Sequence, residues 1–163
     1  MRKYFLRKGE GEKILADLLK NFKKNDFFKE NPRVEAIELQ ANEMIILVDN
    51  HPFIVKRNDK TYPSLIFYEA LNKLPKVAVD MGAIPHICNG ADVMAPGIKK
   101  IEGSFEPGSL VVVIDEKYAK PIAIGDAIVS SKFLAGAKHG KAIKNAHYVG
   151  DRFWKVIKEF KQQ

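Results

Sequence analysis

The spacing of apolar residues near the start of the chain predicts an amphipathic helix. The apolar positions recur at intervals of three and four residues, which gathers them on one helical face: Ile14, Leu15, Leu18, Leu19 and Phe22. We therefore expect a helix over residues 12–23. A short strand is expected over residues 3–6, and the glycines within residues 8–11 are expected to form a turn before the helix.

The next apolar segments are rich in residues that favour strands. Residues 34–39 and 44–48 are expected to form a hairpin, and residues 53–56 a third strand. A final helix is expected over residues 64–74, where Pro75 ends it. Residues 1–74 are thus predicted to form one α+β domain.

Beyond Pro75 the pattern changes to short strands separated by turns. A strand is expected at residues 76–79 and an irregular helical turn near Ile84, because Pro85 lacks a backbone N–H. Further strands are expected at residues 91–95, 110–114, 121–124, 126–130, 147–149 and 153–156. Alternating apolar residues would fill a barrel core: Val111, Val113, Ile122, Ile124 and Ile128. Residues 75–163 are thus predicted to form a second domain, packed against the first because the linker is short.

The stretch of residues 89–98 contains two glycines and a proline, and Lys99 and Lys100 follow it directly. Gly90 stands where a helix would end in a left-handed residue, and Pro96-Gly97 is the pair that a type II turn requires. The prediction is a turn, a short strand and a second turn, with exposed backbone N–H groups. Such groups beside two lysines suit a phosphate group.

Residues 90–98, which read Gly-Ala-Asp-Val-Met-Ala-Pro-Gly-Ile, resemble the signature loop of PUA domains, which are small RNA-binding barrels. The turn at residues 106–108 and the segment 121–125 fit the same domain. More narrowly, and over nearly its whole length, the chain resembles the malignant T-cell-amplified sequence family of translation factors, in an archaeal-type form. The residues that carry this wider resemblance are Tyr62, Pro63, Ser64, Leu65, His147, Tyr148, Asp151 and Trp154.

The resemblance implies an α+β fold in which an N-terminal α/β pre-PUA domain packs on a C-terminal PUA β-barrel. In PUA domains the RNA-binding face is formed by the first helix, the signature loop and the final strand. Transferred to this chain, the RNA-binding residues would be Gly90, Ala91, Asp92, Val93, Met94, Ala95, Pro96, Gly97, Ile98, Lys99, Lys100, Lys144 and His147.

The function that the resemblance implies is a non-enzymatic RNA-binding translation factor without a cofactor. It would contact the small ribosomal subunit or tRNA during initiation, reinitiation or recycling. Two alternatives remain open. One is an accessory RNA-binding subunit for an RNA-modifying enzyme, and the other is a protein-interaction module that docks an initiation-type partner through the N-terminal domain.

The composition of the chain is consistent with an RNA partner but does not require one. The formal net charge is +7 and the isoelectric point about 9.4, which favours a polyanionic partner. A single cysteine, Cys88, fits a reducing compartment and reads as a small buried hydrophobe. The apolar run at the N-terminus is too short for a signal peptide and no segment reaches the length of a membrane span, so a cytoplasmic protein is expected. A monomer is also expected.

Other candidate sites are weak. The glycine loop at residues 136–142 lacks one residue of a nucleotide-binding loop and has alanine in place of the magnesium-binding hydroxyl, although it could touch an RNA backbone. The four histidines are too dispersed for a zinc site. Asp115 and Glu116 are expected in a solvated turn, and Tyr148 and Trp154 in the core. No catalytic centre is predicted.

Overall fold

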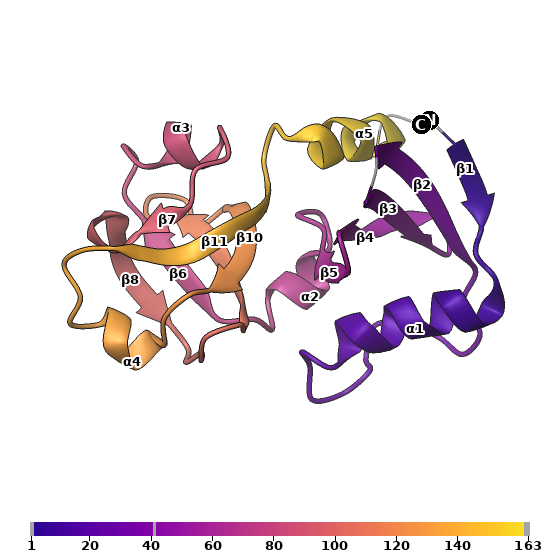
Figure 1. The fold of residues 1–163 in the computed structure, drawn as a ribbon, viewed down its shortest axis with the longest axis horizontal. Coiled ribbons are helices and arrows are strands. Elements are labelled where there is room, and N and C mark those ends of the chain that lie inside the picture. The colour runs from indigo at the N-terminus through magenta and orange to yellow at the C-terminus, as the bar shows by residue number, and fades with distance from the viewer. Residues whose placement is uncertain (1, 41, 162–163) are drawn as a thin grey trace. The chain divides into compact units, whose positions relative to one another are not determined.

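The computed structural model describes residues 2–40 and 42–161, which form a mixed α+β structure (Figure 1). The backbone divides into two compact units. The first unit contains residues 1–73 together with residues 155–163, and the second unit contains residues 74–154. The second domain expected from the sequence, residues 75–163, includes the end of the chain, whereas the residues from Lys155 onward belong to the first unit here.

The first unit contains an antiparallel sheet in which each strand pairs with its neighbours in the sequence (Figure 1). Its strands are β1 (Arg2–Phe5), β2 (Val34–Gln40), β3 (Glu43–Val48), β4 (His51–Arg57) and β5 (Lys60–Pro63). The predicted hairpin of β2 and β3 is confirmed, whereas β5 was not predicted. Asp49 and Asn50 join β3 to β4 with φ angles of 47° and 70°, as in a type I′ turn.

Helix α1 (Lys8–Leu19) supplies Leu15 and Leu18 to the core of the first unit. It begins before the predicted start at residue 12, so the expected turn at residues 8–11 is wrong. Gly11 lies inside the helix, and a Cβ atom at this position would stand 3.2 Å from the Cβ atom of Val34. The glycine therefore lets the helix approach β2 closely instead of ending it.

The second helix of the first unit, α2 (Tyr68–Leu71), is only one turn long. The prediction of a helix over residues 64–74 is therefore wrong at both ends. Ser64 is bonded to β4 instead, because its backbone N–H donates to the Phe53 carbonyl at 2.8 Å and its hydroxyl donates to the Pro52 carbonyl at 2.7 Å. These two bonds hold the chain against a strand where a helix was expected.

The last element, α5 (Arg152–Lys161), is a helix where the sequence suggested a barrel strand at residues 153–156. Asp151 precedes the helix, and its Oδ1 atom accepts a hydrogen bond from the backbone N–H of Trp154 at 2.7 Å. This is the geometry of an N-cap, which stabilises the start of a helix. Val156 and Ile157 are buried, while Lys155 and Lys158 are exposed.

The second unit contains a six-stranded sheet in the order β7-β11-β10-β9-β6-β8. Its strands are β6 (Lys76–Val79), β7 (Val93–Met94), β8 (Ile98–Glu102), β9 (Leu110–Asp115), β10 (Pro121–Ala127) and β11 (Lys141–Tyr148). The strands β7 and β8 lie at opposite ends of this order, yet only the 3-10 helix η1 (Ala95–Gly97) separates them in the chain. The sheet must therefore curl until its two edges meet, which produces a barrel.

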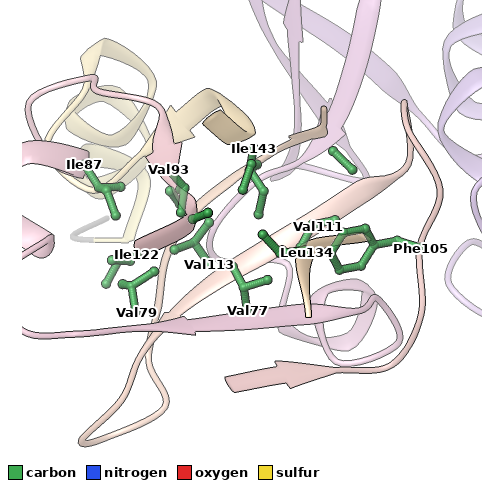
Figure 2. Packing of buried hydrophobic residues seen from close by; sticks show 14 residues of the cluster. Val77, Val79, Ile87, Val93, Phe105, Val111, Val113, Ile122, Leu134 and Ile143 are labelled. Carbon is green, nitrogen blue, oxygen red and sulfur yellow. The ribbon is translucent and has the colours of Figure 1, made fainter. Parts of the chain in front are cut away.

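Apolar side chains from every part of this sheet fill the barrel (Figure 2). Figure 2 shows Val77, Val79, Val111, Val113 and Ile122 converging with side chains from the connecting segments. Two short helices, α3 (Ile84–Ile87) and α4 (Ser131–Leu134), contribute Ile87 and Leu134. Four of the five predicted core residues are buried, but Ile128 is 42% exposed and lies beyond the end of β10.

Strand β10 runs without interruption through Gly125, so the predicted division into strands at 121–124 and 126–130 is wrong. The register shifts between Ile124 and Gly125, where β10 pairs with β11. A Cβ atom on Gly125 would stand 2.0 Å from the carbonyl oxygen of Lys144. The glycine is needed because the two backbones approach each other closely there, not because the chain turns.

Asp115 ends β9 and is almost fully buried, which corrects the prediction of a solvated turn. Its Oδ1 atom accepts a hydrogen bond from the backbone N–H of Lys117 at 2.9 Å, and Oδ2 accepts one from Lys120 at 3.0 Å. Burial alone would raise the pKa of this carboxyl, but the backbone donors of the turn together hold it below its ordinary value. The carboxylate therefore organises the turn between β9 and β10.

Candidate nucleic-acid interface

The predicted loop begins at the end of α3, where the chain reverses direction. Gly90 has a φ angle of 97°, which confirms the expected left-handed residue. The N–H of Gly90 donates to the Ile87 carbonyl at 3.0 Å, and the N–H of Ala91 donates to the His86 carbonyl at 3.0 Å. Both amides are thus used to close the helix, so the expectation that they are free for a phosphate group is wrong.

The second predicted turn has a different geometry. Residues Ala95–Gly97 form η1, and Gly97 does not adopt the left-handed conformation that a type II turn requires at this position. A Cβ atom on Gly97 would make an ordinary contact of 3.5 Å with the Cβ atom of Ala83. The N–H of Asp80 donates to the Gly97 carbonyl at 3.0 Å, so this turn is held against the segment that follows β6.

Asn145 of β11 fixes the loop from the other side. Its side-chain Nδ2 group donates to the carbonyls of Ile87 and Ala91, each at 3.0 Å. Its backbone N–H donates to Oδ1 of Asp92 at 2.9 Å, and Oδ2 of Asp92 lies 3.3 Å from Nζ of Lys141. Three bonds from one residue therefore determine where the loop lies relative to β11.

The sequence interpretation did not identify Asn145. Asparagine is uncommon in strands, and the strand expected in this region began only at residue 147, so no local signal marked Asn145. The Oδ1 atom of Asn145 is buried and accepts no hydrogen bond within the part of the chain that the structure describes. Asp92 was predicted to touch RNA, but its carboxylate is used to bind Asn145 and Lys141.

Exposed lysines flank the loop on two strands. Lys99 and Lys100 lie on β8, and Lys144 lies on β11. Lys100 forms an ion pair with Glu102 at 3.3 Å, whereas Lys99 and Lys144 form none with the described residues. Asp126 lies directly opposite Lys144 in the register between β10 and β11, which places one carboxylate near this lysine.

His147 is a correction to the predicted site. Its side chain is completely buried, and its Nδ1 atom lies 2.8 Å from Oδ2 of Asp151. The same Asp151 oxygen accepts the backbone N–H of Tyr148 at 2.9 Å. His147 thus holds the end of β11 to the N-cap of α5 and does not present a group to RNA. Tyr148 is half-buried against the barrel core, as the sequence predicted.

The loop nevertheless offers a surface of small and basic residues. The predicted site residues with exposed side chains or backbone are Gly90, Ala91, Met94, Pro96, Lys99, Lys100 and Lys144. Val93 and Ala95 point into the core, while Asp92, Gly97 and Ile98 are half-buried. Small side chains permit close approach of a nucleic-acid backbone, and the unpaired lysines supply charge for its phosphates.

Within residues 2–40 and 42–161, no three His, Cys, Asp or Glu side chains come together as a group that could hold a metal ion. None of the helices in the same ranges has the length and apolar character that are needed to cross a membrane.

Two family models match consecutive parts of the chain. The PUA domain matches residues 75–149, and a domain of unknown function, DUF1947, matches residues 2–74. Together these matches account for almost all of the residues that the structure describes.

Proteins from several organisms are also similar along most of their length. An uncharacterised protein of Methanocaldococcus jannaschii is 40% identical over 154 residues, which cover 94% of this chain and 95% of that protein. The malignant T-cell-amplified sequence 1 homolog of Dictyostelium discoideum is 30% identical, and the match covers 83% of this chain and 78% of that protein. Translation machinery-associated protein 20 of Saccharomyces cerevisiae is 25% identical, and the match covers 86% of this chain and 84% of that protein.

A solved structure agrees in fold. The crystal structure of a hypothetical protein from Pyrococcus horikoshii superposes with a TM-score of 0.82 at 35% identity and covers 96% of this chain and 99% of that one. The similarity therefore extends through both units. The chain belongs to the malignant T-cell-amplified sequence family, with a DUF1947 domain followed by a PUA domain.

Proposed function

We propose that this protein is a non-enzymatic translation factor that binds the small ribosomal subunit or tRNA. The RNA would lie on the basic loop surface, which we define as the exposed parts of residues 90–98 with Lys99, Lys100 and Lys144. Family membership and relatives whose names refer to translation support a role in RNA binding and translation. The contacts with a ribosomal subunit or tRNA are the proposed part.

One observation carries the proposal: Lys99 and Lys144 are exposed on two strands that flank the loop and are unpaired among the described residues. A lysine that is held in an ion pair must break that pair to bind a phosphate, whereas these two lysines need not. Their flanking positions allow phosphates on both sides of the loop to be bound while the small loop residues permit close approach. This arrangement favours a folded RNA backbone over a small metabolite.

The test is a binding measurement with charge-reversed variants of the full chain. Affinity for tRNA and for purified small ribosomal subunits is measured by fluorescence polarisation and sedimentation, at several salt concentrations. The Lys99→Glu, Lys144→Glu double variant is expected to lose affinity. The slope of the logarithm of its affinity against the logarithm of the salt concentration should fall by about one for each lysine replaced.

A matched control uses Lys117→Glu with Lys120→Glu, because both lysines are exposed on the turn between β9 and β10. This control changes the net charge equally but lies outside the basic loop surface, so it should retain most of the affinity. Equal losses in the two double variants would show that only net charge matters, and the assignment of the surface would be rejected.

Binding to neither RNA, by a folded wild-type protein, would reject the proposed function itself. Recovery of the protein bound to an RNA-modifying enzyme, instead of to ribosomal subunits or tRNA, would favour the accessory-subunit alternative. Ribosome binding that survives Lys99→Glu with Lys144→Glu would favour docking through a protein partner.

A further inference from the structure

A second candidate site lies in the first unit, where the turn between β3 and β4 meets β1 and α5. It is a cavity of about 510 Å³ that is lined by Lys3, Asn50, His51, Pro52, Phe53, Ile66 and Phe160. All of these residues belong to the first unit. Its volume lies within the range of about 300–1,000 Å³ that is typical of small-ligand sites. We call it the His51 pocket.

Three stacked rings run from the core of the first unit to this pocket. The ring of Phe53 stacks on the buried Phe67 with centroids 4.3 Å apart and planes inclined by 12°. The imidazole of His51 stacks on Phe53 at 5.0 Å and 16°. His51 is exposed, so the outermost ring of the stack is presented at the surface. A flat aromatic ligand could extend this stack by one member.

The backbone on both sides of His51 is fixed before any ligand arrives. Asp49 and Asn50 form the tight turn that precedes it, and both have left-handed φ angles. Ser64, which is fully buried, bonds to the carbonyls of Pro52 and Phe53 as described above. The ring therefore stands on a rigid support, which lowers the entropy that a ligand must overcome.

The charge of the lining favours an anion. Among the described residues that line the pocket, Lys3 carries a formal charge and none has a carboxylate. The Nζ atom of Lys3 lies 5.9 Å from the centroid of the Phe160 ring. Lys3 also lies 3.6 Å from the carboxylate of Glu35, which is 3.7 Å from Nε of Arg33. Lys3 can thus turn toward a ligand while Arg33 continues to neutralise the buried Glu35.

We propose that the His51 pocket binds one unpaired nucleotide of an RNA, with its base stacked on the His51 ring and its phosphate at Lys3. Aromatic rings hold single-stranded bases by stacking, and a lysine beside them binds the backbone. Asn50 is one of the lining residues, and an asparagine amide can pair with the edge of adenine. The pocket lies in a different unit from the basic loop surface and does not depend on it.

The experiment is an NMR titration of the full-length protein with adenosine 5′-monophosphate. Saturable shifts are expected for the backbone amides of Asn50, His51 and Phe53 and for the His51 ring protons. Inorganic phosphate alone should shift Lys3 with little effect on His51, and adenosine alone should bind more weakly than the nucleotide. Uridine 5′-monophosphate should also bind more weakly, because its base stacks over a smaller area.

His51→Ala should weaken nucleotide binding about tenfold, which corresponds to the loss of one stacked base. His51 is exposed, so the variant should remain folded, and its amide spectrum verifies this. The matched control is His139→Ala, which removes an exposed histidine from the second unit. Lys3→Ala should weaken binding of the nucleotide but not of adenosine.

The absence of saturable shifts around His51 would overturn the proposal. So would nucleotide binding that His51→Ala leaves unchanged, or binding that Lys99→Glu with Lys144→Glu abolishes. Nucleotide binding at His51 in a protein that fails to bind tRNA and ribosomal subunits would support the pocket and reject only the proposed function.

Discussion

Replacement of Asn145 by aspartate tests whether this residue holds the basic loop surface in place. The change preserves the size of the side chain but replaces the Nδ2 donor with an acceptor. In the variant a carboxylate oxygen would face the carbonyls of Ile87 and Ala91, which lie 3.0 Å from Nδ2 in the wild-type protein. Two hydrogen bonds are lost, and two oxygen–oxygen repulsions take their place.

The magnitude follows from the contacts of both amide atoms. Each lost hydrogen bond costs about 1 kcal/mol. The Ile87 carbonyl still accepts the N–H of Gly90, and Ala91 is exposed, so neither carbonyl becomes a buried acceptor without a partner. We therefore expect Asn145→Asp to lower the free energy of unfolding by about 2 kcal/mol from the two lost bonds, and the two oxygen–oxygen repulsions add to this loss. Asn145→Ala should cost less, because it also removes the buried Oδ1 atom that accepts no hydrogen bond from the described residues.

Urea unfolding followed by circular dichroism measures the stability of each variant, and fluorescence polarisation measures its affinity for tRNA. Asn89→Asp is the matched control, since Asn89 is exposed beside the same loop and the charge change is identical. It should change stability by less than about 0.5 kcal/mol.

In both assays Asn145→Asp should have a larger effect than Asn89→Asp. An Asn145→Asp protein as stable as the wild type, or an alanine variant less stable than the aspartate variant, would refute the reasoning.

Two further predictions concern stability. Gly125→Ala should prevent β10 and β11 from pairing, because the new Cβ atom would stand 2.0 Å from the Lys144 carbonyl oxygen. Circular dichroism should show a large loss of structure. Gly136→Ala is the control and should be tolerated, because there is open space around Gly136. Asp115→Asn should destabilise the protein at pH 7, as measured by urea unfolding. Because the folded state lowers the pKa of Asp115, its contribution is present above the ordinary pKa of about 4 and is lost as the pH falls through the lower folded value, so the difference from wild type should vanish in acid. A difference that persists unchanged at low pH would contradict this account.

The sequence predicted elements well where local periodicity and packing agree. The β2–β3 hairpin and the strand β6 have the expected limits to within a few residues, and Gly90 has the left-handed conformation that its position predicted. In each case one short-range property, either strand propensity or the freedom of glycine, decides the local structure.

The predictions from the sequence were wrong where a contact between distant residues determines the local structure. Gly11 and Gly125 were interpreted as breaks in regular structure, but both lie inside elements and make room for another backbone or side chain. Residues 153–156 are apolar enough for a strand, yet the cap from Asp151 begins a helix there. Short apolar segments do not distinguish a strand from a helix without such long-range information.

The same limit applies to the candidate site. The exposed lysines and the loop could be identified from the sequence, because charge and glycine content are local properties. The burial of His147 and the three bonds of Asn145 could not, because both depend on how β11 pairs and ends. A polar residue that is close to a predicted site can serve to support it instead of contacting the ligand.

The pairing of Asp92 with Asn145 joins positions that are 53 residues apart, and it has a consequence for synthesis of the protein. When a ribosome has made the loop but not yet β11, the nascent chain lacks Asn145 and its three bonds to the loop, and closing so long a segment carries an entropic cost. The basic loop surface can therefore take its final form only late in elongation. An incomplete chain that lacks β11 would therefore not form the surface that we propose for RNA binding.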